Sequence, residues 1–109
     1  MEFIKVLDTA ELPENSMVSV VAAGKEMLLA NVAGTYHAIA HKCSHAGGSL
    51  SKGALNGGVV TCPRHGAQFD VTTGQAVGDA KVAFLKIPVK DVESYPVKVE
   101  GGAILVGVP

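Results

Sequence analysis

The sequence predicts an all-β domain, a small antiparallel β-sandwich or barrel built from many short strands. Short Val-rich runs alternate with Gly-containing turns over the first half of the chain. Near the end, Tyr95, Val97 and Val99 alternate with Pro96, Lys98 and Glu100, which is the period-two pattern of a half-buried strand. The sequence has no amphipathic helical pattern of useful length and no internal repeat. These observations favour a β fold over a helical or mixed one.

The first half of the chain predicts a meander of antiparallel strands. Residues 3–7 form a first strand, and residues 8–12 a capped helical turn that Pro13 ends. Three longer strands follow, separated by turns at 23–24 and 33–34, and they cover residues 16–22, 25–32 and 35–41. This arrangement brings Cys43 to the end of a sheet.

The second half is expected to be more irregular. Residues 46–53 are rich in Gly and Ser and predict a loop, whereas Asn56-Gly57 predicts a hairpin within residues 54–60. A strand at 69–71 precedes a tight turn, and residues 79–84 are interpreted as a loop. Pro96 favours an edge strand or a strand start. Residues 101–102 predict a turn that leads into a last strand at residues 103–108. The aromatic residues expected in the core are Phe3, Tyr36, Phe84 and Tyr95.

Length and composition limit the possible classes of protein. The 109 residues, with a net charge of −1, predict a single domain over residues 1–109. The sequence has no apolar run of membrane-spanning length and no secretory signal pattern, so we expect a cytoplasmic protein without a membrane partner. The near-neutral charge argues against nucleic-acid binding. We expect a monomer.

Two short runs carry the chemistry: Cys43-Ser44-His45 and Cys62-Pro63-Arg64-His65. These are the only cysteines of the chain, and a His follows each of them. Two thiolates and two imidazoles form a four-ligand set that suits zinc or iron.

The ligand runs lie in a span without acidic residues. No Asp or Glu occurs from Met27 through Phe69, whereas the span contains Lys42, Lys52 and Arg64. We expect these three side chains to form a basic docking surface for acidic partner proteins.

The stretch from Cys43 to Gly74 resembles the cluster-binding region of the Rieske iron–sulfur family. The resemblance rests on the C-x-H run, the later C-P-x-H-G run and the following Phe69-Asp70. It implies a fold of antiparallel sheets with a small inserted cluster-binding subdomain, here about residues 42–70. It also implies one [2Fe–2S] cluster per chain, with Cys43 and Cys62 on one iron and His45 and His65 on the other.

Residues beside the ligands are expected to shape the site. By the same resemblance, Pro63 stiffens the second loop, while Gly47, Gly48 and Gly66 allow the backbone to approach the sulfides. High-potential members from cytochrome bc-type complexes carry hydroxyl donors where this chain has Ala67 and Phe69, and loop-joining cysteines where it has Gly48 and Arg64. These departures predict a ferredoxin-class potential of roughly −150 mV.

The cysteines allow two other interpretations. Each Cys could be a small buried hydrophobic residue, but the paired spacing argues against this. A structural zinc is the sharper alternative, although zinc fingers place both Cys together and both His together. His37 and His41 could compete as ligands, but on a strand they are expected to be half-exposed side chains.

The sequence therefore predicts a soluble one-electron carrier rather than an enzyme. The resemblance implies that it passes electrons from a flavin-dependent reductase to a terminal oxygenase or similar enzyme. A Rieske oxygenase needs a large second domain, for which 109 residues leave no room. The alternative is a non-catalytic Rieske subunit of a larger oxidoreductase, such as a nitrite-reductase-like small subunit.

Overall fold

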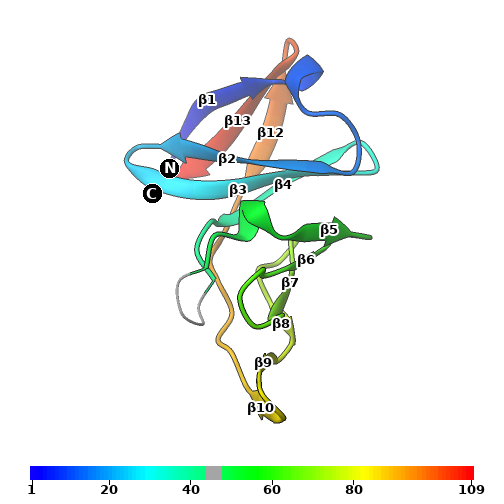
Figure 1. The fold of residues 1–109 in the computed structure, drawn as a ribbon. Coiled ribbons are helices and arrows are strands. Elements are labelled where there is room, and N and C mark those ends of the chain that lie inside the picture. The colour runs from blue at the N-terminus through cyan, green and yellow to red at the C-terminus, as the bar shows by residue number, and fades with distance from the viewer. Residues whose placement is uncertain (44–47) are drawn as a thin grey trace.

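The computed structural model describes residues 1–43 and 48–109, and it consists almost entirely of antiparallel strands (Figure 1). One three-stranded sheet has the order β1-β13-β12 and contains Glu2–Asp8, Ala103–Val108 and Val97–Glu100. A four-stranded sheet has the order β11-β4-β3-β2 and contains Ser94–Tyr95, Thr35–Ala40, Lys25–Val32 and Ser16–Ala22. These two sheets form the upper part of the molecule in Figure 1.

Two smaller sheets make up the rest. The order β5-β6-β7-β8 joins Ala54–Asn56, Val59–Thr61, Gln68–Asp70 and Ala76–Gly78. The hairpin of β9 and β10 joins Ala80–Val82 and Leu85–Ile87. Two short 3-10 helices are also present, η1 at Thr9–Glu11 and η2 at Leu50–Lys52. No helix in the described part of the chain is long and apolar enough to cross a membrane.

The β11-β4-β3-β2 sheet is covered on both faces, which explains the sequence of its central strand. Strand β3 contains the continuous apolar run Met27–Ala30, all four residues of which are buried. Met27 and Leu29 pack with Ile104 and Val106 of the three-stranded sheet. Their neighbours Leu28 and Ala30 face the opposite way, into the cluster that contains both cysteines. A strand buried on both faces needs no polar alternation.

Most strands of the first half are where the sequence predicts them. Strands β2 and β3 have the predicted bounds, and β13 does as well. The capped turn is the 3-10 helix η1, in which the backbone N–H of Asp8 donates to Oε1 of Glu11 at 3.1 Å. The all-β fold class is thus confirmed.

The chain changes sheets at Pro96. Strand β11 pairs with β4 before this residue, and β12 pairs with β13 after it. Both are edge strands, as the proline predicts, because Pro has no N–H to donate to a neighbour. The Pro96 carbonyl accepts the backbone N–H of Gly107 at 2.8 Å.

Three predictions about local structure were wrong. The predicted loop at 79–84 contains β9 and leads through a tight turn into β10. Phe84, expected in the core, is 95% exposed at that turn. The hairpin of β5 and β6 turns at Gly57-Gly58 rather than Asn56-Gly57, because both of these glycines have positive φ, which suits a type I′ turn.

The predicted loop at 46–53 is described only from Gly48 onward. Within that part, Leu50–Lys52 form the 3-10 helix η2, and the Leu50 side chain is fully buried.

Candidate metal centre

The two cysteines begin two loops that are built alike. The backbone N–H of Cys43 donates to the carbonyl of Gly48 at 2.8 Å, and that of Cys62 donates to the carbonyl of Ala67 at 2.7 Å. The residues that flank each loop form an antiparallel pair: Lys42 pairs with Ser49, and Thr61 pairs with Gln68. In both loops the cysteine is therefore the first residue and lies where the backbone is held.

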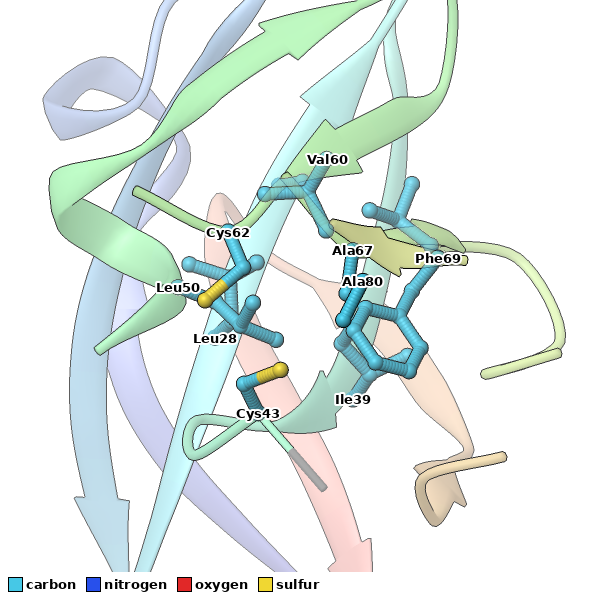
Figure 2. Packing of buried hydrophobic residues seen from close by; sticks show 11 residues of the cluster. Leu28, Ile39, Cys43, Leu50, Val60, Cys62, Ala67, Phe69 and Ala80 are labelled. Carbon is cyan, nitrogen blue, oxygen red and sulfur yellow. The ribbon is translucent and has the colours of Figure 1, made fainter. Parts of the chain in front are cut away.

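Both thiols are buried in the same apolar cluster. Cys43 is 3% exposed and Cys62 is 2% exposed, and neither forms a disulfide. Figure 2 shows the two sulfurs beside Leu28 and Leu50, with the ring of Phe69 farther along the cluster. A pair of buried thiols from facing loops is a soft donor set that suits iron or zinc.

Gly48 and the second loop lie against each other. A Cβ at Gly48 would lie 2.8 Å from Sγ of Cys62 and 3.6 Å from Cβ of Arg64. The first distance means that only glycine leaves the Cys62 sulfur its space. The second is within the Cβ–Cβ range that a disulfide spans. Positions 48 and 64, where bc-type members carry their loop-joining cysteines, are thus direct neighbours.

His65 differs from the cysteines in being exposed at the surface. Its neighbour Gly66 has φ +74°, a left-handed conformation that favours glycine, so this residue turns the loop back toward β7. The His65 carbonyl accepts the backbone N–H of Lys81 at 2.6 Å, which ties the second loop to β9. Pro63 and Arg64 are exposed on the same loop.

His41 is buried rather than half-exposed, so this prediction was wrong. The residue is 7% exposed, and its ring bridges two segments: Nδ1 lies 3.1 Å from Oε2 of Glu26, and Nε2 lies 2.7 Å from Oγ of Ser51. Its carbonyl also accepts the backbone N–H of Leu50 at 3.0 Å. His41 therefore fastens both ends of the first ligand loop to the sheet. The sequence contains no motif that would have revealed this role. His37 is half-buried on β4.

Three of the four predicted ligands lie in the described part of the chain. His45 and Gly47 lie outside the described residues. Among residues 1–43 and 48–109, no group of three or more His, Cys, Asp or Glu side chains is placed to hold one metal ion. The structure thus brings Cys43 and Cys62 into one cluster, and His65 is an exposed residue of the loop that Cys62 begins.

Two of the residues predicted to lie beside the ligands are buried in the same cluster as the thiols. Ala67 and Phe69 are 1% and 0% exposed, and both belong to the cluster that contains the two cysteines. Neither side chain can donate a hydrogen bond. The three basic residues, Lys42, Lys52 and Arg64, are all exposed, on or beside the two loops.

Fold and site together define a small β protein whose two facing Cys/His loops suit a metal cluster. The family model for the Rieske [2Fe-2S] domain matches residues 2–96. The chain therefore belongs to the Rieske [2Fe–2S] family, whose members bind a [2Fe–2S] cluster.

The curated relatives are ferredoxin components, which are electron carriers rather than catalytic enzymes. One is the ferredoxin component of the naphthalene 1,2-dioxygenase system of Pseudomonas aeruginosa, 34% identical over 96% of this chain and 94% of its own length. Another is the 3-phenylpropionate/cinnamic acid dioxygenase ferredoxin subunit of Escherichia coli, 35% identical over 100% of this chain and 96% of its own length.

Solved structures show the same fold in two settings. The ferredoxin of carbazole 1,9a-dioxygenase from Nocardioides aromaticivorans IC177 matches with a TM-score of 0.84 at 28% identity, over 97% of both chains. The terminal oxygenase of that system matches with a TM-score of 0.87 at 28% identity, but this chain covers only 30% of it. The fold thus occurs both as a separate carrier and as part of a larger oxygenase chain.

Proposed function

We propose that this protein carries single electrons from a flavin-dependent reductase to a terminal oxygenase, as a cytoplasmic monomer with one [2Fe–2S] cluster. The observation that carries the proposal is the difference in exposure within the ligand set. Cys43 and Cys62 are almost completely buried, whereas His65 is exposed on the same loop as Cys62. A carrier needs this arrangement, because its redox group must be shielded from water yet approachable from one side.

The donor residues fit a Rieske cluster. We assign the ligands as Cys43, His45, Cys62 and His65, within a cluster-binding subdomain of about residues 42–70. The two loops begin with a cysteine at equivalent positions, and Gly48 leaves the space that the Cys62 sulfur occupies. When bound, the cluster supplies reversible storage of one electron. Leu28, Leu50 and Phe69 exclude water from the sulfur side.

The neighbours of the thiols favour a potential at the low end of the Rieske range. Hydrogen bonds to cluster or thiolate sulfur stabilise the reduced, more negative state and so raise the potential. Ala67 and Phe69 offer no such donor, although both are buried in the same cluster as the cysteines. We therefore assign a potential of roughly −150 mV.

The basic residues around the loops give the site a docking surface. Lys42, Lys52 and Arg64 are exposed, and the surrounding span from Met27 through Phe69 contains no acid. Partners with acidic surfaces would be attracted and oriented toward the His65 side of the molecule.

Electron transfer in a reconstituted system tests this function. The holo-protein, reduced by a flavin-dependent reductase, is mixed in a stopped-flow instrument with a terminal oxygenase of the naphthalene or phenylpropionate type. We expect oxygenase reduction that depends on this protein and is lost in Cys62→Ser, with His37→Ala as a matched control that retains it. Oxygenase reduction that is equally fast without the protein would contradict the proposal. A second component that co-purifies in fixed stoichiometry would instead favour the subunit of a larger oxidoreductase.

A further inference from the structure

The hairpin of β9 and β10 presents an apolar tip to solvent. Phe84 is 95% exposed and Leu85 is 58% exposed. Phe84 is one of only three Phe residues in the chain. The hairpin lies at the end of the molecule opposite the β12–β13 turn, and it extends beyond the small sheet that supports the second ligand loop (Figure 1). An almost fully exposed aromatic side chain has no role in the fold of the monomer, whereas aromatic residues are enriched at the centres of protein interfaces.

The register of the hairpin separates an inner face from an outer one. Ala80 pairs with Ile87 and Val82 with Leu85, so these side chains share one face. Ala80 is fully buried in the cluster that contains the cysteines, and Ile87 packs against the same cluster. The inner face thus attaches the hairpin to the body of the protein, which keeps the tip in a fixed position.

The outer face carries two lysines. Lys81 and Lys86 are directly opposite each other in the register, and both are exposed. Like charges at opposite positions of an antiparallel pair are unfavourable for the isolated protein. The hairpin itself contains no Asp or Glu, and the nearest acid in the sequence is Asp79, two residues before Lys81. Carboxylates on a partner would compensate this charge.

The turn adds a further local cost. Ala83, the first residue of the turn, has φ +56°, a conformation that a non-Gly residue adopts only at an energetic penalty. The same conformation occurs at Ala23 and Ala33, so it does not distinguish this turn. What distinguishes the hairpin is the combination of exposed apolar surface with paired like charges.

The hairpin is joined to the candidate electron-transfer edge. The backbone N–H of Lys81 donates to the carbonyl of His65, so β9 and the second ligand loop form one continuous surface. A protein seated on the tip and along β9 would therefore also border the second ligand loop. A ferredoxin of the same fold, 26% identical and matched with a TM-score of 0.81, was solved in complex with the oxygenase of carbazole 1,9a-dioxygenase.

From these observations we infer that the hairpin tip is an anchor for the terminal oxygenase. Phe84 inserts into an apolar pocket of the oxygenase whose rim carries carboxylates facing Lys81 and Lys86. The inference rests on the proposed function and adds an apolar anchor to the basic surface of Lys42, Lys52 and Arg64. The anchor holds the partner on the His65 side while the electron crosses.

The wild-type holo-protein is first assayed with a panel of reductases and terminal oxygenases of the naphthalene and phenylpropionate types. The test then uses the reductase and the oxygenase with which it reacts fastest. We expect Phe84→Ser to lower the second-order rate constant for oxygenase reduction by about tenfold or more, as for an interface hot spot. Lys81→Gln with Lys86→Gln should lower the same constant and weaken its dependence on salt. The potential, the EPR spectrum and the rate of reduction by the reductase should not change.

Matched controls lie at the opposite end of the molecule. Val99→Ala removes an exposed apolar side chain from β12, and Lys25→Gln removes an exposed charge at the start of β3; neither should alter the rate. The Phe84→Leu variant keeps an apolar tip, so it should retain most of the wild-type rate of oxygenase reduction.

Three results would overturn the inference. The first is an unchanged oxygenase rate in Phe84→Ser, and the second is an equal loss with the reductase, which would make the hairpin a general docking element. The third is loss of the cluster in Phe84→Ser and Phe84→Leu, which would make Phe84 a structural residue. If the reductase reduces the wild-type protein but the wild-type protein reduces none of the oxygenases, the proposed function itself fails. This outcome differs from the three above, in which the protein still reduces an oxygenase or loses its cluster only in the variants.

Discussion

A side-chain carbon at Gly48 would lie only 2.8 Å from the Sγ of Cys62, so the first loop packs directly on the sulfur of the second. We expect Gly48→Ala to move the two loops apart, because a real Cβ does not approach a fixed sulfur so closely. The cost should be about 1–3 kcal/mol, typical of overpacking. The iron content after purification and the thermal unfolding of the holo-protein measure this effect.

The control for that variant is a glycine far from the site. Gly24 has φ +76° and nothing within 4 Å of an added Cβ, so Gly24→Ala introduces backbone strain without touching the cysteines. It should lower stability but leave the iron content of the folded protein unchanged. Full iron occupancy in Gly48→Ala would contradict the close packing of the loops.

Hydroxyl groups introduced beside the thiols should raise the reduction potential. Phe69→Tyr combined with Ala67→Ser adds two donors within the cluster of residues that surrounds Cys43 and Cys62. A hydrogen bond that favours the reduced state by about 1.4 kcal/mol raises a one-electron potential by about 59 mV. Protein-film voltammetry measures the shift. Phe3→Tyr, which adds the same hydroxyl on β1, should leave the potential at its wild-type value, and no shift in the double variant would show that these positions do not face the sulfurs.

Electron-transfer rates should fall steeply as salt is raised from low to physiological concentration. The basic side chains of Lys42, Lys52 and Arg64 are exposed around the loops, and the screening length for exposed charges falls from about 30 Å at 0.01 M salt to about 8 Å at physiological ionic strength. Replacing the three by Gln should lower the rate at low salt and flatten its salt dependence. The rate is measured by stopped flow with the oxygenase in excess. A flat wild-type profile would rule out this docking surface.

His41 should be required for the stability of the first ligand loop. The His41→Ala variant loses both ring contacts, to Glu26 and Ser51, and leaves a buried gap at the base of that loop. We expect a loss of about 1–3 kcal/mol in the free energy of unfolding, the range for disrupting buried hydrogen bonds. Urea unfolding of the apoprotein measures it without interference from the cluster. The half-buried His37, four residues earlier on β4, provides the control, and an equal loss in His37→Ala would mean that the His41 contacts carry no special weight.

The regular part of the fold could be predicted because its sequence pattern and its structure agree. The bounds of β2 and β3 follow from turns at 23–24 and 33–34, where each first residue is an Ala with positive φ and each second residue is Gly. The sequence also predicts that Cys43 lies at the end of a sheet, and it directly follows the last strand of the meander and a short bridge. The burial of the two cysteines was not predicted, because it depends on packing against Leu28 and Leu50 from distant parts of the chain.

The errors have identifiable physical causes. The β9–β10 hairpin turns at Ala83-Phe84, and this pair contains none of the Gly or Asn residues by which such turns are recognised. Phe84 was assigned to the core because aromatic residues are usually buried, and a docking role would explain why it is not. His41 was expected to be half-exposed because a single sequence does not show that Glu26 and Ser51 meet it in space.

The most direct test of the central claim is EPR spectroscopy of the dithionite-reduced protein, with iron and sulfide determined on the same sample. The account predicts two irons and two sulfides per chain, a Rieske-type EPR spectrum, and nitrogen couplings in pulsed EPR that fall from two imidazoles to one when His65 is replaced by Cys. A single zinc without sulfide, or a [2Fe–2S] spectrum without nitrogen coupling, would contradict a cluster held by Cys43, His45, Cys62 and His65.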